Sequence, residues 1–478
     1  MQENQSETNS SLKDLTFIAL FSLMFGSMMG SGVFDIPQNV AHQSGAIAVT
    51  LSWIITGIGM LALGFAFVYI TKKRPDIQSG IYGYAKHGFG DYVGFNAAWG
   101  YWFNGVLGNV SYLIYIFSTL GNFALFKFFG HGNTAIALIT ESVLIWVVYF
   151  LVVRGIREAS IVNIMITTVK LLALFAVVMV FIYGFSFAKF KANFTLDLHL
   201  GSVLDQIKST MLVTVWDFTG IEAACIYALR AKNMKDVARA TMLGVVVVLV
   251  IDALISLLPF GIISSAQVAQ LSTPSTAGVL SEVSGVFSAE LIRTAVVISV
   301  SGALLAWTLL ATNILYLASE DKTMPKFLTK MNHKNVPRNA LLVTSVVVQI
   351  FVVAAYYTQS VYLAMIQLAT SMVLVPYLLS AIFAFKLIVT DGKVDLIAFL
   401  KGLIAVLYGI WVIYAGGLKY LAFSTLLYGL GILVYAVGRK EQKKPIFSNM
   451  FEALLFVFLV VVGVVSLYLW VSGKLSLS

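Results

Sequence analysis

The stretch Gly26-Ser27-Met28-Met29-Gly30-Ser31-Gly32-Val33-Phe34 interrupts the first long apolar segment of the chain, and Pro37 follows it closely. Each glycine weakens a helix by about 1 kcal/mol relative to alanine. In the hydrocarbon of a membrane, loosened backbone is tolerated only where it is buried in protein or lines a cavity. Small residues also let two membrane helices approach closely, so a tight helix interface is the alternative. The density of glycine and serine before a proline favours a broken membrane helix.

A second interruption lies in the sixth apolar segment, at Thr214-Val215-Trp216-Asp217-Phe218-Thr219-Gly220-Ile221-Glu222. A carboxylate at membrane depth costs several kcal/mol if it faces lipid. In a continuous helix, Asp217 and Glu222 would lie about 140° apart, at 100° per residue. A break near Gly220 would let both face one cavity. The alternatives are a protonated carboxyl group, or one that is held by a neighbouring tyrosine or serine.

The composition of the whole chain is that of a membrane protein. Hydrophobic residues make up 59% and charged residues 11% of the 478 positions, whereas roughly a quarter of a soluble domain is charged. A membrane-spanning helix needs about 20 apolar residues. Thirteen segments qualify, near 15–44, 46–71, 92–125, 132–153, 160–187, 206–229, 238–264, 288–318, 340–358, 361–387, 396–416, 418–438 and 449–472. We therefore predict an all-α polytopic membrane protein with 12–13 transmembrane helices.

The two interruptions fall in the first and sixth spans, which are matching places in two five-helix units. Transporters that are built from inverted repeats carry broken helices at such places. We predict an inverted five-helix repeat core over 15–390, with helices 1 and 6 broken. Residues 391–445 would add helices 11 and 12, and residues 446–478 an extra helix 13.

The basic residues follow a membrane topology. With the N-terminus placed inside, Lys and Arg concentrate in every second loop, as expected for cytoplasmic loops. As a separate prediction, we expect the chain to lie in the inner membrane of a bacterium. Residues 1–14 are predicted as a cytoplasmic tail, because they lack the basic start and short apolar core of a cleaved signal peptide. Segment 266–287, rich in Ser, Thr and Gly, is predicted as an external loop. The net charge of +9 therefore requires no nucleic acid as a partner.

The two breaks together indicate the chemistry of a ligand. The start of a half-helix presents amide donors and a positive dipole end, which suit a carboxylate. Carbonyl groups that are freed on the other side of a break accept hydrogen bonds from an ammonium group. An amino acid carries both groups and would satisfy both breaks.

At these residues the chain resembles the amino acid–polyamine–organocation superfamily, and within it the basic amino acid/polyamine antiporters, which include arginine/agmatine and arginine/ornithine exchangers. The resemblance covers roughly the first 390 residues. The matching stretches are 29–34, 79–84, 100–109, 216–222 and 307–311.

The resemblance implies a role for each matching residue. Ser31 and Gly32 would hold the substrate carboxylate, and the carbonyl groups of Met28, Trp216 and Thr219 would accept from its α-ammonium group.

Other residues of the resemblance would gate the site or contact the substrate side chain. Trp216 would close over the substrate, and Glu222, with Tyr101 as its partner, would link substrate binding to the pH response. Trp307 would stack on a guanidinium group, a contact worth roughly 0.5–2 kcal/mol. The distal end of the side chain would be contacted by Asn104, Gly105 and Asn109.

Two charged residues need separate interpretation. Lys170, midway along the fifth span, resembles a lysine that stands in for a sodium ion in related carriers, and a buried lysine can also exchange a proton. The alternative is a structural partner for carbonyl groups or a carboxylate. Asp217 departs from the family pattern, in which a small or apolar residue is commoner. With Asp35 and Asp252 it makes the pathway rich in acids, which favours cationic substrates.

We therefore predict an amino acid transporter and no enzyme: an antiporter that exchanges a basic amino acid (arginine, ornithine or lysine) for a related cationic amine or amino acid by alternating access. The alternative is proton-coupled uptake of neutral or aromatic amino acids. A channel would need a continuous pore, and the histidines fall at span ends or in loops, which disfavours a membrane enzyme. The single cysteine, Cys225, excludes a disulfide framework, and no Cys/His cluster indicates a metal or cofactor. The expected partners are small amino acids or amines, the lipid bilayer and a second copy in a homodimer.

Overall fold

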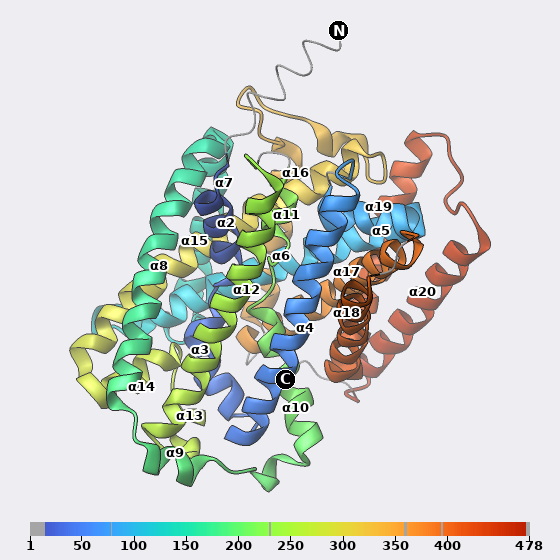
Figure 1. The fold of residues 1–478 in the computed structure, drawn as a ribbon. Helices are drawn as coiled ribbons and strands as arrows, with labels where there is room; N and C mark the ends of the chain where they lie inside the picture. The colour runs from blue at the N-terminus through green and yellow to red at the C-terminus, as the bar shows by residue number, and fades with distance from the viewer. Residues whose placement is uncertain (1–14, 78, 229–230, 358–360, 393–394, 475–478) are drawn as a thin grey trace.

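Long helices make up the protein, which is described here by a computed structural model (Figure 1). The structure describes residues 15–77, 79–228, 231–357, 361–392 and 395–474, without the side chains of 156–164, 361 and 418. Within these ranges the only β-pairings are two isolated bridges. The predicted tail, 1–14, lies outside the described residues. Arg230 and Lys393, two of the loop residues that belong to the predicted charge pattern, also lie outside them.

The first five spans include one bent helix. They are α2 (Phe17–Met28) with α3 (Gly32–Ala41), then α4 (Ala46–Lys73), α6 (Asp91–Gly121), α7 (Ala135–Arg154) and α8 (Ile156–Gly184). Shorter helices in this half are α5 (Gly80–Phe89), which joins α4 to α6, and η1 (Ala124–Phe129).

The second half also contains long helices and one broken helix. Its long helices are α12 (Met234–Leu257), α15 (Val286–Glu320), α16 (Arg338–Tyr356), α17 (Val361–Thr390), α18 (Leu396–Ala415), α19 (Gly417–Glu441) and α20 (Met450–Val471). Its shorter helices are α9 (Phe187–Asn193), η2 (Leu198–Leu200), α10 (Val203–Trp216), α11 (Ala223–Ile226), η4 (Leu258–Gly261), α13 (Ser265–Ala269), α14 (Ser275–Ser284) and η5 (Lys326–Thr329).

The number of spans depends on the two breaks. Among the described residues, eleven helices are long and apolar enough to cross a membrane, and the bent pair α2–α3 adds a twelfth. The sixth predicted segment consists of α10, with 14 residues, and α11, with 4, so neither piece can span alone. The prediction of an all-α polytopic membrane protein is confirmed, and the helix is broken in both predicted segments.

Segment 266–287 is not a simple loop, because it contains α13 and α14. A capping box between Ser264 and Gln267 starts α13. Val279 and Leu280 of α14 are buried against the bundle, and this packing outweighs the polar composition that predicted a loop.

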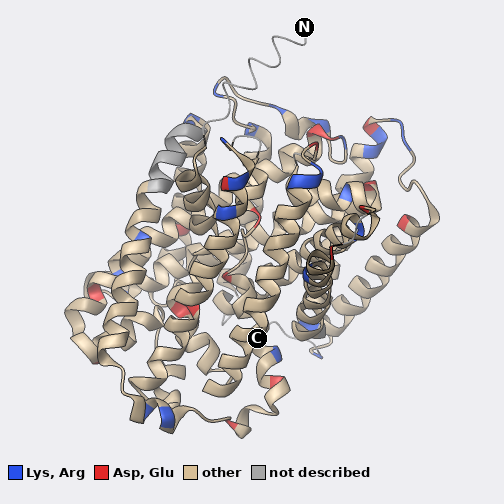
Figure 2. Ribbon diagram, in the orientation of Figure 1, with Lys and Arg blue, Asp and Glu red and all other residues tan. Residues whose placement is uncertain are grey.

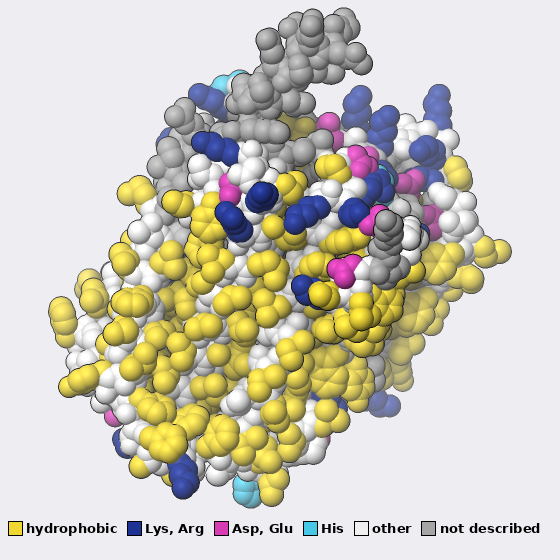
Figure 3. Space-filling model, viewed as in Figure 1, with side chains coloured by type: hydrophobic (Ala, Val, Ile, Leu, Met, Phe, Trp, Pro, Cys, Tyr) yellow, Lys and Arg dark blue, Asp and Glu magenta, His cyan; other side chains and the backbone are white. Residues whose placement is uncertain are grey.

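Basic side chains and apolar surface occupy different parts of the helix bundle. Figure 2 shows Lys and Arg gathered mainly at the end where the chain begins, and Figure 3 shows an apolar band across the visible flank. Helix α6 is buried along almost its whole length, between α15 and α17. Helix α20 lies at the edge, packed mainly on α19 (Figure 1). The interior around α6 is therefore where a transport pathway can lie.

Candidate binding site at the two helix breaks

The first break leaves backbone groups free inside the protein. Helix α2 ends at Met28 and α3 begins at Gly32, with a bend of 40° between them. Met29 has φ −79° and ψ 81°, outside the helical range. The first N–H groups of a helix have no acceptor within it, and they form its positive end. Because residues 28–32 are buried, the break faces protein and not lipid.

The second break contacts the first. Residues 217–222 form turns between α10 and α11, and Gly220 has φ +102°, a conformation that glycine adopts without strain. A Cβ atom on Gly220 would lie 2.6 Å from Oγ of Ser27. The Ser27 hydroxyl donates to the carbonyl of Met24 at 2.8 Å and lies 3.3 Å from that of Gly220. The two broken helices thus meet in the interior.

Asp217 lies against the start of α3. A Cβ atom on Gly32 would meet Oδ1 of Asp217, and it would lie 2.7 Å from Cδ1 of Trp216. Asp217 is fully buried, and neither of its carboxylate oxygens has a hydrogen-bond partner among the described residues. Asp252 of α12 shares both properties, and it is near enough to Asp217 for the two groups to interact electrostatically. The break therefore holds acidic groups that have no counter-charge bonded to them.

Trp216 fills the space between α3 and α6. Its Cη2 atom lies 3.0 Å from the place of a Cβ on Gly108, and its ring centroid is 5.9 Å from that of Tyr112. A larger side chain at Gly108 would therefore displace the indole. Trp216 thus packs against both α3 and α6, and its role as the gate remains a prediction.

Glu222 is bonded to two tyrosines from different helices. Tyr101 of α6 donates to Oε1 at 2.5 Å, and Tyr377 of α17 donates to Oε2 at 2.8 Å. The Tyr377 hydroxyl also accepts from the N–H of Gly220 at 3.2 Å. The Tyr101 contact is the one that the sequence predicts, whereas Tyr377 was missed. A tyrosine in the middle of an apolar span is the only signal that could have indicated it.

Lys170 of α8 binds carbonyl groups that the first break sets free. Its Nζ atom donates to the carbonyl of Met29, and to that of Gly26 at 3.3 Å. A cation thus occupies a cluster of oxygen atoms beside the break. The contact fits both interpretations of Lys170, since a carbonyl cluster is also where a metal cation would bind.

The carbonyl groups that were predicted to bind the substrate's ammonium group differ in how many hydrogen bonds they already accept. The carbonyl of Met28 accepts one bond, from Gly30 N–H at 2.9 Å. That of Trp216 accepts two from Thr219, one from its N–H at 3.0 Å and one from its hydroxyl at 2.7 Å. A carbonyl oxygen has two lone pairs, so Met28 retains an acceptor site and Trp216 does not in this state.

Trp307 of α15 is tied to the first break. Its indole N–H donates to the carbonyl of Ser27 at 3.0 Å, and its ring centroid is 5.9 Å from that of Tyr101. A Cβ atom on Gly105 would lie 3.5 Å from Trp307 Cε3. These contacts place the predicted stacking ring beside Gly105, and the stacking itself remains a prediction.

The two asparagines of α6 bond to neighbouring helices. Asn104 donates to the carbonyl of Ala369 at 2.9 Å, and Asn109 donates to the Thr308 hydroxyl at 3.1 Å. The side-chain oxygen of each is buried and has no partner among the described residues. Each therefore keeps an acceptor free for a donor such as a guanidinium group.

Helix α3 is bonded to the first residue of α14 and to the segment just before it. Asp35 accepts from the Thr273 hydroxyl at 2.9 Å and from the Ser275 N–H at 2.8 Å. Tyr362 of α17 donates to the Ser31 hydroxyl at 3.0 Å. These bonds join the first break and α3 to α14 and α17.

A cluster of ion pairs lies toward the opposite end of the bundle. Lys86 of α5 lies 2.9 Å from a carboxylate oxygen of Asp321 and 3.8 Å from one of Asp91. Arg439, at the end of α19, pairs with the other oxygen of Asp91 at 2.7 Å. The two breaks thus lie between two sets of polar contacts, one toward each end of the bundle.

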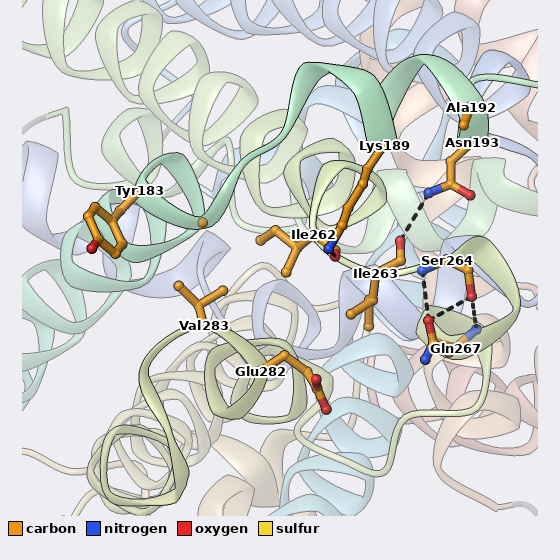
Figure 4. A pocket seen from close by; sticks show the side chains of 11 residues that line it. Tyr183, Lys189, Ala192, Asn193, Ile262, Ile263, Ser264, Gln267, Glu282 and Val283 are labelled. Atoms are coloured by element: carbon orange, nitrogen blue, oxygen red, sulfur yellow. Dashed lines mark hydrogen bonds between the residues drawn. The ribbon is translucent and has the colours of Figure 1, made fainter.

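A cleft of about 590 Å³ lies away from these breaks, between the end of α8, α9, α13 and α14 (Figure 4). Its Lys189 and Asn193 side chains donate to backbone carbonyl groups at 2.8 and 3.1 Å. Its Gln267 accepts from both the N–H and the hydroxyl of Ser264. Because these polar groups already serve the local loop, the cleft is a weaker candidate than the breaks.

Comparisons with known proteins concern nearly the whole chain. The model of the amino acid permease family matches residues 15–423. The arginine/ornithine antiporter of Pseudomonas aeruginosa is 41% identical, over 98% of this chain and 100% of its own length. The arginine/agmatine antiporter of Chlamydia caviae is 38% identical, over 98% of this chain and 99% of its own. That of Chlamydia pneumoniae is also 38% identical, over 99% of this chain and 100% of its own.

Proposed function

This chain belongs to the amino acid permease family, and on that basis we propose that it exchanges a basic amino acid for a related cationic amine or amino acid. It is a multi-pass membrane transporter and not an enzyme. The relatives named above are antiporters of arginine against ornithine or agmatine, which does not favour the alternative of proton-coupled uptake of neutral amino acids.

One observation carries the proposal: the two broken helices meet at Ser27 and Gly220, and acidic groups without bonded counter-charges lie beside them. A buried carboxylate is costly unless a cation or a proton joins it. A site of this kind favours a small cationic solute over a neutral one.

The substrate is proposed to lie across the two breaks. Its α-ammonium group would bond to the carbonyls of Met28 and Thr219, and to that of Trp216 once the Thr219 hydroxyl turns away. Its carboxylate, where it has one, would lie at Ser31 and Gly32, where the positive end of α3 favours an anion.

The side chain of the substrate would extend along α6. The free acceptors of Asn104 and Asn109 suit a guanidinium or ammonium group, and Gly105 lets α6 pack closely against Ala311 and the ring of Trp307. Trp216 would close over the substrate from the side of α10.

Access would alternate by opening one closure at a time. Release of Asp35 from Thr273 and Ser275 would open the end near α14, and release of Lys86 from Asp321 would open the other. Glu222 and Tyr101 would move with the change in access. Lys170 would hold the first break in place of a metal cation.

The proposal also includes three predictions from the sequence: the orientation of the protein in the membrane, the division of its core into two repeats, and its assembly into a homodimer. The basic end of the bundle (Figure 2) would face the cytoplasm of a bacterium, with the N-terminus inside. The core over 15–390 would consist of two inverted repeats, with the remaining helices outside it, and two copies would form a homodimer.

Counterflow into proteoliposomes tests the function. Vesicles loaded with unlabelled arginine, agmatine or ornithine should take up labelled arginine faster than empty vesicles do. Equal uptake into loaded and empty vesicles would rule out exchange. Uptake of a neutral amino acid into empty vesicles, driven by a pH gradient alone, would support the alternative instead.

A further inference from the structure

Asp217 brings a carboxylate of the protein itself to the place where a substrate carboxylate is expected. Its Oδ1 atom meets the position of a Cβ on Gly32, at the first turn of α3. The positive end of a helix favours an anion. The two oxygens of Asp217 nevertheless have no hydrogen-bond partner among the described residues, and the side chain is fully buried.

The charged groups around Asp217 do not neutralise it through a direct bond. Lys170 donates to the carbonyls of Gly26 and Met29. Tyr112 of α6 and Asp252 of α12 interact with Asp217 electrostatically, but neither supplies a positive charge. The described part of the protein thus leaves Asp217 without a bonded counter-charge, which a cation from outside the protein can supply.

We propose that Asp217 replaces the carboxylate that a decarboxylated amine lacks, so that the site binds a cationic amine more tightly than the corresponding α-amino acid. This inference rests on the proposed exchange function and names which of its two solutes is preferred. An amine would place its ammonium group beside Asp217 and bring no second anion.

An α-amino acid meets a different situation in the same site. Its own carboxylate would approach Ser31 and Gly32, and it would come close to the carboxylate of Asp217. Two like charges a few ångströms apart repel each other strongly where water is excluded. The amino acid therefore binds at a cost that the amine does not meet.

The first experiment uses the unaltered protein and pairs of solutes that differ only in the carboxylate. Arginine is compared with agmatine, and ornithine with putrescine, as inhibitors of agmatine counterflow. We expect each amine to inhibit at a concentration lower by about tenfold or more. Argininamide keeps the α-ammonium group and has no negative charge, so it should inhibit more strongly than arginine. Equal or stronger inhibition by arginine would overturn the inference.

The second experiment changes the charge of Asp217. Asp217→Asn and Asp217→Ser should both reduce the preference for agmatine over arginine, by about tenfold. Glu141→Gln is the matched control, because Glu141 of α7 is also buried and one of its carboxylate oxygens has no bonded partner among the described residues, but it lies against α16, away from the two breaks. It should leave the preference within about threefold of that of the unaltered protein.

The outcomes separate this inference from the proposed function. An unchanged preference in both Asp217 variants, or an equal shift in Glu141→Gln, contradicts the role of Asp217. If neither variant folds, the inference is still tested in the unaltered protein, where argininamide must inhibit more strongly than arginine. Absence of counterflow with every cation contradicts the proposed function, whereas counterflow that prefers arginine contradicts only the role of Asp217.

Discussion

Ser27 and Gly220 join the two broken helices, although 193 positions separate them in the chain. The Ser27 hydroxyl lies 3.3 Å from the Gly220 carbonyl, and a Cβ on Gly220 would lie 2.6 Å from the same hydroxyl. The close approach requires a residue without a side chain, and the φ of +102° requires the same. Position 220 therefore requires glycine for two independent reasons, the close contact with Ser27 and the positive φ.

Gly220→Ala should therefore abolish most exchange and lower the thermal midpoint. The backbone conformation alone costs about 1–3 kcal/mol for a residue other than glycine, and the contact with Ser27 adds to it. Gly285→Ala is the matched control, because Gly285 has φ +82° with nothing within 4 Å of its added Cβ. Counterflow and thermal unfolding of both variants measure the difference. Equal losses in the two variants would show that backbone strain, and not the contact between the breaks, matters.

Tyr377→Phe should reduce exchange through Glu222. It removes one donor from a buried carboxylate, and a buried group without its partner costs about 1–3 kcal/mol. Tyr428→Phe is the control, because the Tyr428 hydroxyl is also buried and donates to the carbonyl of Met372 at 2.7 Å, away from the breaks. It should affect stability but not the exchange rate. If Tyr377 acts through Glu222, its substitution should have a smaller effect on exchange in a Glu222→Gln background.

Lys170→Gln should impair exchange in sodium-free buffer. The carbonyls of Gly26 and Met29 lose their cation, and the loss of a charged partner costs about 1.5–3 kcal/mol. Partial recovery of counterflow when sodium is added would support the interpretation that the lysine replaces an ion. A variant that loses activity to the same extent in sodium and in choline buffer would favour the structural interpretation.

Thr273→Val should open the site toward the end that carries α14. It removes one of the two donors that hold Asp35, and hydrogen bonds to charged groups are worth about 1.5–3 kcal/mol. Access is measured by thiol labelling of Ser31→Cys in a Cys225→Ser background. Thr276→Val is the matched control, because the buried Thr276 hydroxyl has no partner among the described residues. Labelling that rises equally in both variants would contradict the closure.

The sequence predicts the helices and their breaks better than it predicts the contacts between them. Long apolar segments identify spans because lipid excludes other structures, and the glycines around Ser31 and at Gly220 indicate where helices are interrupted. The partner of Glu222 on α6 follows from the resemblance. Its partner Tyr377 lies 155 positions away, and an apolar span gives no periodic pattern that shows which face meets which helix.

Local composition also misleads where packing decides. The polar segment before α15 folds into α14 because Val279 and Leu280 are buried. The carbonyl of Trp216 was predicted as an open acceptor, and only the structure shows that Thr219 already fills it. Hydrogen bonds of this kind depend on rotamers and turn geometry, which the order of residues does not specify.

The two bonds of Glu222 have a consequence for water. Tyr101 belongs to the first five spans and Tyr377 to the next five, so one carboxylate is bonded to both sets of helices. Glu222 itself lies in the sixth span, in the same set as Tyr377, so a rigid rotation of one set against the other would break the bond to Tyr101. The tyrosine that is released must find another hydrogen-bond partner, because buried polar groups are rarely left alone. We expect that partner to be water, so that every transport cycle hydrates the centre of the bundle and dries it again.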